Sequence, residues 1–207
     1  MPVPAHLPQS TRPDGPAPAG ATPEELVVLL DGEGRAIGTA PKASVHTSDT
    51  PLHLAFSCYV LRGDRMLITQ RAQAKPTWPG VWTNACCGHP APGEAPEAAV
   101  RRRLDQELGL QDVTDLELVH PDFRYRAVMD NGLVEHELCP VYLARVPDGA
   151  DPRPDPREVA DHRWLTVAEF RTELLRDPQD HSPWALEQLE ALRDHDVLGA
   201  QAPGGAA

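Results

Sequence analysis

The sequence predicts an α/β (α+β) fold in which helices pack on a mixed β-sheet. Two pairs of short apolar segments are joined by tight turns, and other stretches have the apolar spacing of amphipathic helices. Strands and helices also alternate along the chain, which by itself is typical of a parallel sheet. Because the turn-joined pairs require antiparallel neighbours, we expect both kinds of pairing.

Two hairpins open the folded region. Residues 24–40 are predicted to form two short strands around an Asp-Gly-Glu-Gly turn, and residues 52–72 a second hairpin around Arg-Gly-Asp. Residues 132–146 are predicted to form one long strand. Residues 156–170 are predicted to pass from a strand into a helix.

Two helices are indicated by their periodicity. The clearest covers residues 96–110, where Gly109 is expected to end the helix. Residues 182–198 are predicted to form a C-terminal amphipathic helix.

One domain, residues 24–198, is predicted between two tails. Residues 1–23 are rich in Pro, Ala and Gly and are predicted to be a disordered extension, with residues 199–207 as a flexible tail. The start of the chain lacks the apolar segment of a signal peptide, and no apolar run approaches the roughly 20 residues that span a bilayer. We therefore expect a cytoplasmic protein.

The formal charge of −12 argues against nucleic acid or an anionic membrane as a general partner. It leaves room for a small anionic substrate, because a basic pocket or a bound cation can override the overall field. The four cysteines lack the regular spacing of a secreted disulfide framework.

Cys86 and Cys87 stand side by side in the stretch TNACCGHPAPGE, residues 83–94. A disulfide between neighbours is strained, and two ligands without a spacer fit a metal poorly. One of the two is therefore a candidate for a chemical role.

The segment that follows resembles the Nudix box, the loop–helix–loop motif of proteins that handle diphosphates. Glu94 and Arg102 precede the ending Leu-x-x-Glu-x-Gly-Leu. The family pattern has glutamates where this chain has Arg103 and Gln106, whereas Glu107 is retained. Since those carboxylates hold the divalent ions of the hydrolases, the box is predicted not to support hydrolysis. The alternative is a charged amphipathic helix that matches by chance.

A second group combines imidazoles and carboxylates, a mixture suited to a divalent ion such as Mn, Zn or Mg. Its members are His46, His53, His89, Glu135 and Glu137. On a strand, Glu135 and Glu137 project to one face and His136 to the other. Two buried carboxylates this close need a cation to remain ionised. Taken singly, each of these residues is more often an ordinary surface or core residue.

Five stretches in order closely resemble the type 1 isopentenyl-diphosphate isomerases, a non-hydrolytic branch of the Nudix fold. They are HTSDTPLHLAFS, KPTWPGVWTNACCGHP, DFRYRA, VEHELCPV and SPW. The resemblance covers about residues 24–190. It implies a Nudix-type α/β/α sandwich with a mixed β-sheet. It also implies an isomerase that interconverts isopentenyl and dimethylallyl diphosphate by a 1,3-allylic shift, feeding isoprenoid biosynthesis.

The resemblance implies two catalytic groups. Cys87, which directly precedes Gly-His, takes one role, while Cys86 packs. Glu137, with Tyr125 beside it, takes the other. Glu137 would protonate C4 of the alkene, and Cys87 as thiolate would remove a proton from C2 on the opposite face. Trp184 would line the hydrocarbon pocket and stabilise the intermediate cation with its ring.

The implied metal site would hold one Mn²⁺ or Zn²⁺, and its ligands are His46, His53, His89, Glu135 and Glu137. Glu107 would hold a Mg²⁺ that arrives with the substrate diphosphate. The residues that match the diphosphate-binding cations of the family are Lys42, Arg71, Lys75 and Arg103. Arg124 and Arg126 are basic too, but a solvated role suits them equally well.

The expected partner is an isoprenoid diphosphate, with no nucleic acid and no membrane, and the chain is expected to be a monomer or a weak homodimer. Two other functions are weighed against the isomerase. A Nudix diphosphatase would require the full glutamate set, which Arg103 and Gln106 interrupt. A non-catalytic Nudix module would be expected to lose the acid–base pair, yet the Cys, Tyr and Glu residues are all present.

Overall fold

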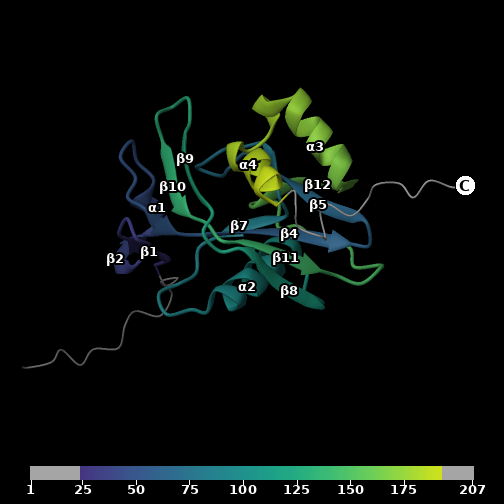
Figure 1. Cartoon of the computed structure of the whole chain (residues 1–207), viewed down its shortest axis with the longest axis horizontal. Coiled ribbons are helices and arrows are strands. Elements are labelled where there is room, and N and C mark those ends of the chain that lie inside the picture. Colours follow the sequence, from purple (N-terminus) through teal and green to yellow (C-terminus); the bar gives the residue numbers. More distant parts are fainter. Residues whose placement is uncertain (1–23, 193–207) are drawn as a thin grey trace, which may run out of the picture.

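The computed structural model describes residues 24–192, which form two mixed β-sheets with helices packed on them (Figure 1). The predicted extension 1–23, the tail 199–207 and the last residues of the predicted C-terminal helix lie outside the described residues. Within residues 24–192, no helix is both long and apolar enough to cross a membrane.

The smaller sheet has five strands in the order β2 (Ala36–Pro41), β1 (Leu26–Leu30), β3 (His53–Leu54), β10 (Val134–Leu138) and β9 (Arg124–Val128). The larger sheet has the order β12 (Val159–Thr166), β5 (Arg65–Arg71), β4 (Phe56–Arg62), β11 (Val141–Arg145) and β8 (Asp115–His120). Two short strands complete it, β6 (Trp82–Thr83) on β5 and β7 (Cys86–Gly88) on β4. The helices are α1 (Lys42–Val45), α2 (Pro96–Leu108), α3 (Val167–Arg176), the 3-10 turn η1 (Pro178–Asp180) and α4 (Pro183–Ala191).

Both kinds of strand pairing occur, as the sequence predicts. The hairpins β1–β2 and β4–β5 are antiparallel, whereas β3–β10 and β4–β11 are parallel. The α+β fold class with mixed pairing is thereby confirmed, although the strands divide between two sheets.

The single long strand predicted for residues 132–146 is wrong. The chain leaves the smaller sheet after β10 and enters the larger one at β11, with Cys139 and Pro140 between them. Pro140 has no N–H to donate to a ladder, which favours the break at this point. The neighbouring segment crosses in the same way between β3 and β4, so Glu137 on β10 stands opposite His53 on β3.

Helix α2 has the ends that its sequence indicates. Pro96 occupies the first turn, and Gly109 adopts the left-handed conformation with φ of 63°. The Gly109 N–H donates to the Asp105 carbonyl oxygen at 2.8 Å. Ala99, Val100, Leu104 and Leu108 face inward. Helix α3 begins with a capping box between Thr166 and Glu169.

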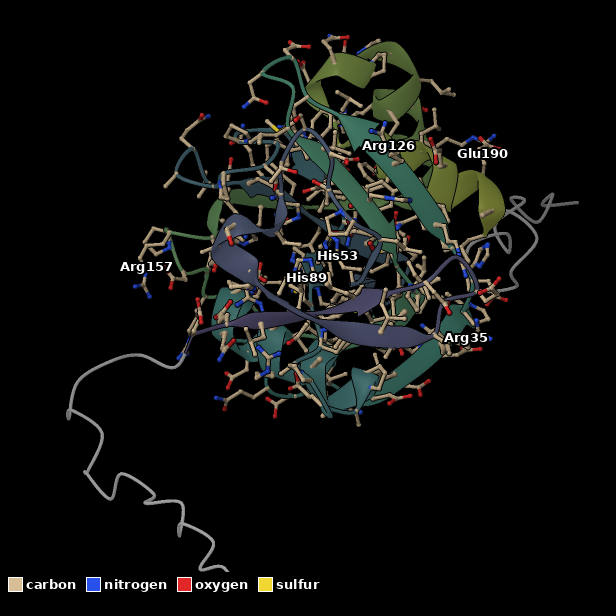
Figure 2. The ribbon with its side chains drawn as sticks, turned by 90° about the vertical axis from the view of Figure 1, so that its left-hand side faces the viewer. Arg35, His53, His89, Arg126, Arg157 and Glu190 are labelled. Carbon is tan, nitrogen blue, oxygen red and sulfur yellow. The ribbon has the colours of Figure 1, made fainter. Side chains whose placement is uncertain are left out.

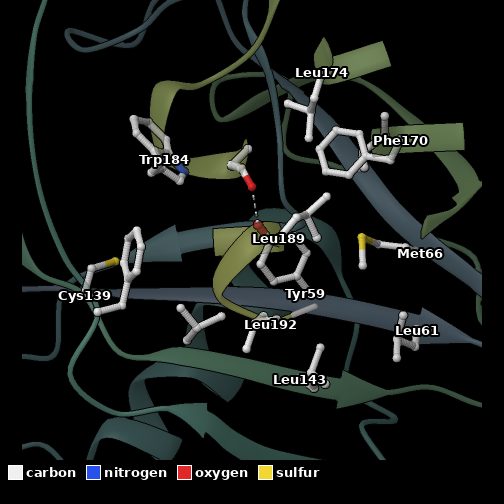
Figure 3. Close-up of a cluster of buried hydrophobic side chains, with 14 of the residues drawn as sticks. Tyr59, Leu61, Met66, Cys139, Leu143, Phe170, Leu174, Trp184, Leu189 and Leu192 are labelled. Atoms are coloured by element: carbon white, nitrogen blue, oxygen red, sulfur yellow. Dashed lines mark hydrogen bonds between the residues drawn. The ribbon is translucent and has the colours of Figure 1, made fainter. Parts of the chain in front are cut away.

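Two hydrophobic cores lie on opposite faces of the larger sheet. The α2 core contains Cys58, Val60 and Leu67 beneath helix α2. The α4 core contains Tyr59, Leu61 and Met66 beneath α3 and α4. Figure 3 is a close-up of this core. Alternation along β4 therefore decides which core each side chain enters.

Candidate functional site

Three imidazoles and one carboxylate meet where the two sheets adjoin. His46 follows α1, His53 lies on β3, His89 follows β7, and Glu137 lies on β10. One potential ligand atom from each lies within 4.8 Å of the others. Figure 2 shows His53 and His89 next to each other in the interior, where their ring centroids are 5.2 Å apart.

Two imidazole nitrogens of this group are available to a metal ion. Nε2 of His46 and Nε2 of His53 are buried and have no hydrogen-bond partner. The opposite nitrogen of His53, Nδ1, pairs with the Pro51 carbonyl oxygen at 2.9 Å, which leaves the Nε2 lone pair available. Glu137 Oε1 lies 3.4 Å from His53 Nε2 and 3.2 Å from His89 Nε2. Three nitrogens and one oxygen fit a divalent ion.

The Tyr125 hydroxyl joins two carboxylates of β10. Its oxygen is 2.9 Å from Glu135 Oε2 and 2.8 Å from Glu137 Oε2. Burial and the charge of Glu137 raise the pKa of Glu135. Burial would also raise the pKa of Glu137, but the three neighbouring histidines outweigh that effect and hold this pKa well below the usual range. Glu135 thus lies beside the four-residue group and not within it.

The two adjacent cysteines point in opposite directions. Because β7 pairs with β4, Cys86 enters the α2 core and Cys87 faces the α4 side. Cys87 Sγ lies 3.5 Å from Ser57 Oγ and 3.2 Å from Asn84 Oδ1. Burial raises the pKa of Cys87 to about 11, against the opposing effects of the Ser57 hydrogen bond and the Arg71 charge.

Most of the predicted site residues line one pocket of about 250 Å³. The candidate proton-transfer, carboxylate and aromatic residues along it are Cys87, Tyr125, Glu135, Glu137 and Trp184, and the cationic or imidazole residues along it are Lys42, His46, Arg71, Lys75, His89 and Arg103. Trp184 packs 5.3 Å from the Tyr125 ring, and its Nε1 donates to Asn84 Oδ1 at 3.1 Å. The indole ring is therefore held in place beside Tyr125 and Asn84.

Glu107 does not line this pocket. It is buried on α2, where its Oε1 accepts from Arg103 Nε at 2.8 Å and lies 3.6 Å from Cys86 Sγ. Arg103 thus stands between Glu107 and the pocket. Arg124 and Arg126 are exposed residues of β9, and Figure 2 shows Arg126 away from His53 and His89. Neither lines the pocket.

Comparison with known proteins identifies the family. A model of the NUDIX domain matches residues 51–188. A Saccharopolyspora erythraea protein named isopentenyl-diphosphate Delta-isomerase is 56% identical over 180 residues, which cover 86% of this chain and 91% of that protein. A Frankia alni protein of the same name is 53% identical over 181 residues, 87% of this chain and 91% of that protein. This chain belongs to the isopentenyl-diphosphate Delta-isomerase family.

Solved structures confirm the fold of this isomerase family member. A crystal structure of a Deinococcus radiodurans protein covers 81% of this chain and 98% of its own, with a TM-score of 0.63 at 16% identity. A MutT protein from Methanosarcina mazei covers 70% of this chain and 96% of its own, with a TM-score of 0.52 at 14% identity. At these identities the likeness concerns the fold alone.

Sequence reasoning missed several polar residues around the catalytic candidates. Asn84 stands three residues before Cys87 in the Thr-Asn-x-x-Cys stretch, so its position in the sequence could have indicated a contact with Cys87. Nothing in the sequence indicates Ser57 or Gln188, because they meet only in the folded chain. There, Gln188 Nε2 donates to Ser57 Oγ at 2.9 Å. Glu158 was missed too, although it pairs with Lys75 and Arg103 at the pocket wall.

Proposed function

We propose that this chain, through its domain at residues 24–198, interconverts isopentenyl diphosphate and dimethylallyl diphosphate and so feeds isoprenoid biosynthesis. The reaction is a protonation–deprotonation 1,3-allylic shift, the work of an intramolecular oxidoreductase that transposes a C=C bond. The observation that carries the proposal is that Cys87 and the Tyr125–Glu137 pair line the same pocket beside Trp184.

The chemistry requires two proton-transfer groups and little water. A proton is added to C4 and another is removed from C2, so the intermediate has the character of a tertiary carbocation. Such a cation is short-lived in water, which favours a buried pocket with an acid and a base on opposite faces of the alkene. The diphosphate is not cleaved, and its binding energy positions the hydrocarbon.

In the direction from isopentenyl diphosphate, Glu137 would give the proton and Tyr125 would orient its carboxyl group through the 2.8 Å hydrogen bond. Cys87 would take the second proton as a thiolate, and the roles reverse in the other direction. Since burial raises the Cys87 pKa, the Arg71 charge and the Ser57 hydroxyl are the groups that support the thiolate. The Trp184 ring face would stabilise the cation, by about 2 kcal/mol in a desolvated site.

The His/Glu group would hold one Mn²⁺ or Zn²⁺, through His46, His53, His89 and Glu137, with Glu135 as the predicted additional ligand. That ion would supply positive charge that orients the Glu137 carboxylate. Glu107 would hold a Mg²⁺ recruited with the substrate diphosphate. The proposed diphosphate-binding cations are Lys42, Arg71, Lys75 and Arg103.

We further propose a cytoplasmic protein that acts as a monomer or a weak homodimer on a small isoprenoid diphosphate, without nucleic acid or membrane partners. The negative formal charge of −12 supports the absence of nucleic acid as a general partner.

The test is to incubate purified protein and Mg²⁺ with isopentenyl diphosphate and follow both products and phosphate. We expect equilibration with dimethylallyl diphosphate and no phosphate release. Phosphate release from a panel of nucleoside diphosphates, without isomerisation, would favour the diphosphatase. Neither activity, in protein that binds the substrate, would favour a binding module.

A further inference from the structure

The cations proposed to hold the diphosphate are already paired with carboxylates. Lys75 Nζ forms an ion pair with Glu158 Oε2, and Arg103 Nη2 lies 3.1 Å from Glu158 Oε1. Lys42, which also lines the pocket, has its Nζ 2.6 Å from Glu25 Oε2. An incoming diphosphate therefore meets cations whose charge is largely neutralised.

Glu158 is held where it can bridge two of these cations. Its backbone carbonyl oxygen accepts from Ala72 N–H at 3.0 Å, and its N–H donates to the Asp155 carbonyl oxygen at 2.9 Å. These bonds fix the residue at the start of β12, and its side chain lines the pocket with 28% of its surface exposed. Burial would raise its pKa, but Lys75 and Arg103 outweigh that effect and lower it, so Glu158 carries a full negative charge at neutral pH.

Arg103 is clamped between two carboxylates. Its Nη2 lies 2.6 Å from Glu107 Oε1 and 3.1 Å from Glu158 Oε1. Arg71 differs, because it donates to neutral oxygens, the Thr77 carbonyl at 2.8 Å and the Trp78 carbonyl at 3.1 Å. Among the four proposed cations, Arg71 is thus the one whose printed hydrogen bonds go to neutral oxygens and not to a carboxylate.

We propose that Glu158, and to a smaller extent Glu25, hold the diphosphate-binding cations before substrate arrives and are displaced from them by the diphosphate. The two carboxylates keep Lys75, Arg103 and Lys42 in position and also limit the affinity for a diphosphate group. This inference rests on the proposed function.

The physical basis is an exchange of ion-pair partners. Each oxygen of the diphosphate that contacts Lys75 or Arg103 replaces, or lies next to, an oxygen of Glu158, so part of its binding energy is used against that competing negative charge. The hydrocarbon part of the substrate makes no such contacts. The effect of Glu158 is therefore expected with inorganic pyrophosphate, which consists of the diphosphate alone.

Glu158→Gln removes the charge and keeps an oxygen that can still accept from one of the two cations. Titration calorimetry with inorganic pyrophosphate, without added Mg²⁺, should show a Kd about tenfold lower than that of the wild type, a change of about 1.4 kcal/mol. Glu25→Gln should lower the Kd only about twofold, because the Glu25 side chain is 62% exposed and its charge is screened by solvent.

Glu173→Gln is the matched control. Glu173 pairs with Arg163 at 3.0 Å and has a side chain 21% exposed, so it resembles Glu158 in charge and burial, but it does not line the pocket. The variant changes the net charge by the same amount. Its Kd for pyrophosphate should equal that of the wild type, which excludes a general effect of net charge.

Thermal melting first establishes that each variant is folded. A Kd in folded Glu158→Gln that is unchanged or higher than the wild-type value would overturn the proposal and make Glu158 a fixed support of the cations. Equal tightening in Glu173→Gln, or no measurable binding in any of the proteins, would overturn it as well. A separate isomerase assay of the wild type distinguishes failure of this inference from failure of the proposed function. If the wild type isomerises substrate but Glu158→Gln binds pyrophosphate no more tightly, this inference fails and the proposed function stands.

Discussion

The two faces of the larger sheet are built by the same strands and both carry a hydrophobic core, but they differ next to the pocket. On the α2 face, Phe56, Cys58 and Val60 of β4 pack under Val100 and Leu104 in a closed, apolar core. On the α4 face, β4 presents Ser57 and Tyr59, which take part in a buried polar network at the edge of the pocket. Strand alternation thus puts the side chains of the α2 core and those of the buried polar network on opposite faces.

The polar network of the α4 face is fully paired. Tyr59 Oη donates to Gln188 Oε1 at 3.0 Å, and Gln188 Nε2 donates to Ser57 Oγ at 2.9 Å, so the Ser57 hydrogen is left for a sulfur acceptor. Asn84 Oδ1 accepts from both Cys87 Sγ and Trp184 Nε1. Buried polar groups destabilise the fold unless they are paired. The hydrogen bonds of this network therefore fix the positions of the side chains around the catalytic candidates.

The adjacent cysteines test this difference most directly and should give the largest effect. Cys87→Ala should lower kcat by about 10³-fold or more, because it removes the proposed proton acceptor, whereas Cys86→Ala loses only packing under α2. Steady-state isomerisation by both variants, with circular dichroism to confirm folding, measures the contrast. Equal losses would show that the face a cysteine occupies does not decide its role.

A metal-ligand variant should give the next largest effect. His89→Ala removes one of the four grouped ligands, and we expect loss of most of the bound ion and about 10²-fold lower activity. Glu135→Gln should reduce metal content less, since that carboxylate lies beside the group. Elemental analysis next to the isomerase assay measures both. Because protons compete for imidazole, occupancy should also fall below about pH 6. Normal metal content and full turnover in His89→Ala would contradict the site.

Removing one member of the polar network should cost stability and activity together. Gln188→Leu leaves the Tyr59 hydroxyl and Ser57 without their partner, and we expect unfolding free energy to fall by about 2 kcal/mol. Leu104→Ala, in the α2 core, should destabilise by about 3 kcal/mol while the folded enzyme keeps its kcat. Urea unfolding measures the stability of each variant, and kcat is measured at urea concentrations below the unfolding transition. Together they distinguish an effect on stability from an effect on catalysis. If Leu104→Ala lost kcat and Gln188→Leu did not, the α2 face and not the α4 face would be the one that supports catalysis.

The smallest effect is expected at the end of α2. Gly109→Ala forces a left-handed φ of 63° on a residue with a Cβ, which would lie 3.1 Å from Arg153 Cβ. The unfolding free energy should fall by about 1 kcal/mol, with no change in kcat. Thermal or urea melts measure the first, and the isomerase assay measures the second. A stabilised variant would mean that the turn after α2 relaxes away from this conformation.

The features that depend on neighbours along the chain could be predicted from the sequence. The hairpins at residues 24–40 and 52–72 follow from local apolar patterns and turns. Gly109 ends α2 because only local backbone geometry matters there. Strand alternation placed Glu135 and Glu137 on one face, and the ordered motifs indicated the family.

The features that depend on partners far away in the sequence could not be predicted and became visible in the folded chain. The strands β8 and β9 were not predicted, because their largely exposed faces carry a weak apolar pattern. Residues 132–146 divide between two sheets, because the part before Pro140 pairs with β3 and the part after it pairs with β4. The same holds at the site. Gln188 reaches Ser57 across 131 residues, and Glu158 reaches Lys75 across 83, because a buried or half-buried polar group takes the partner that the fold brings to it.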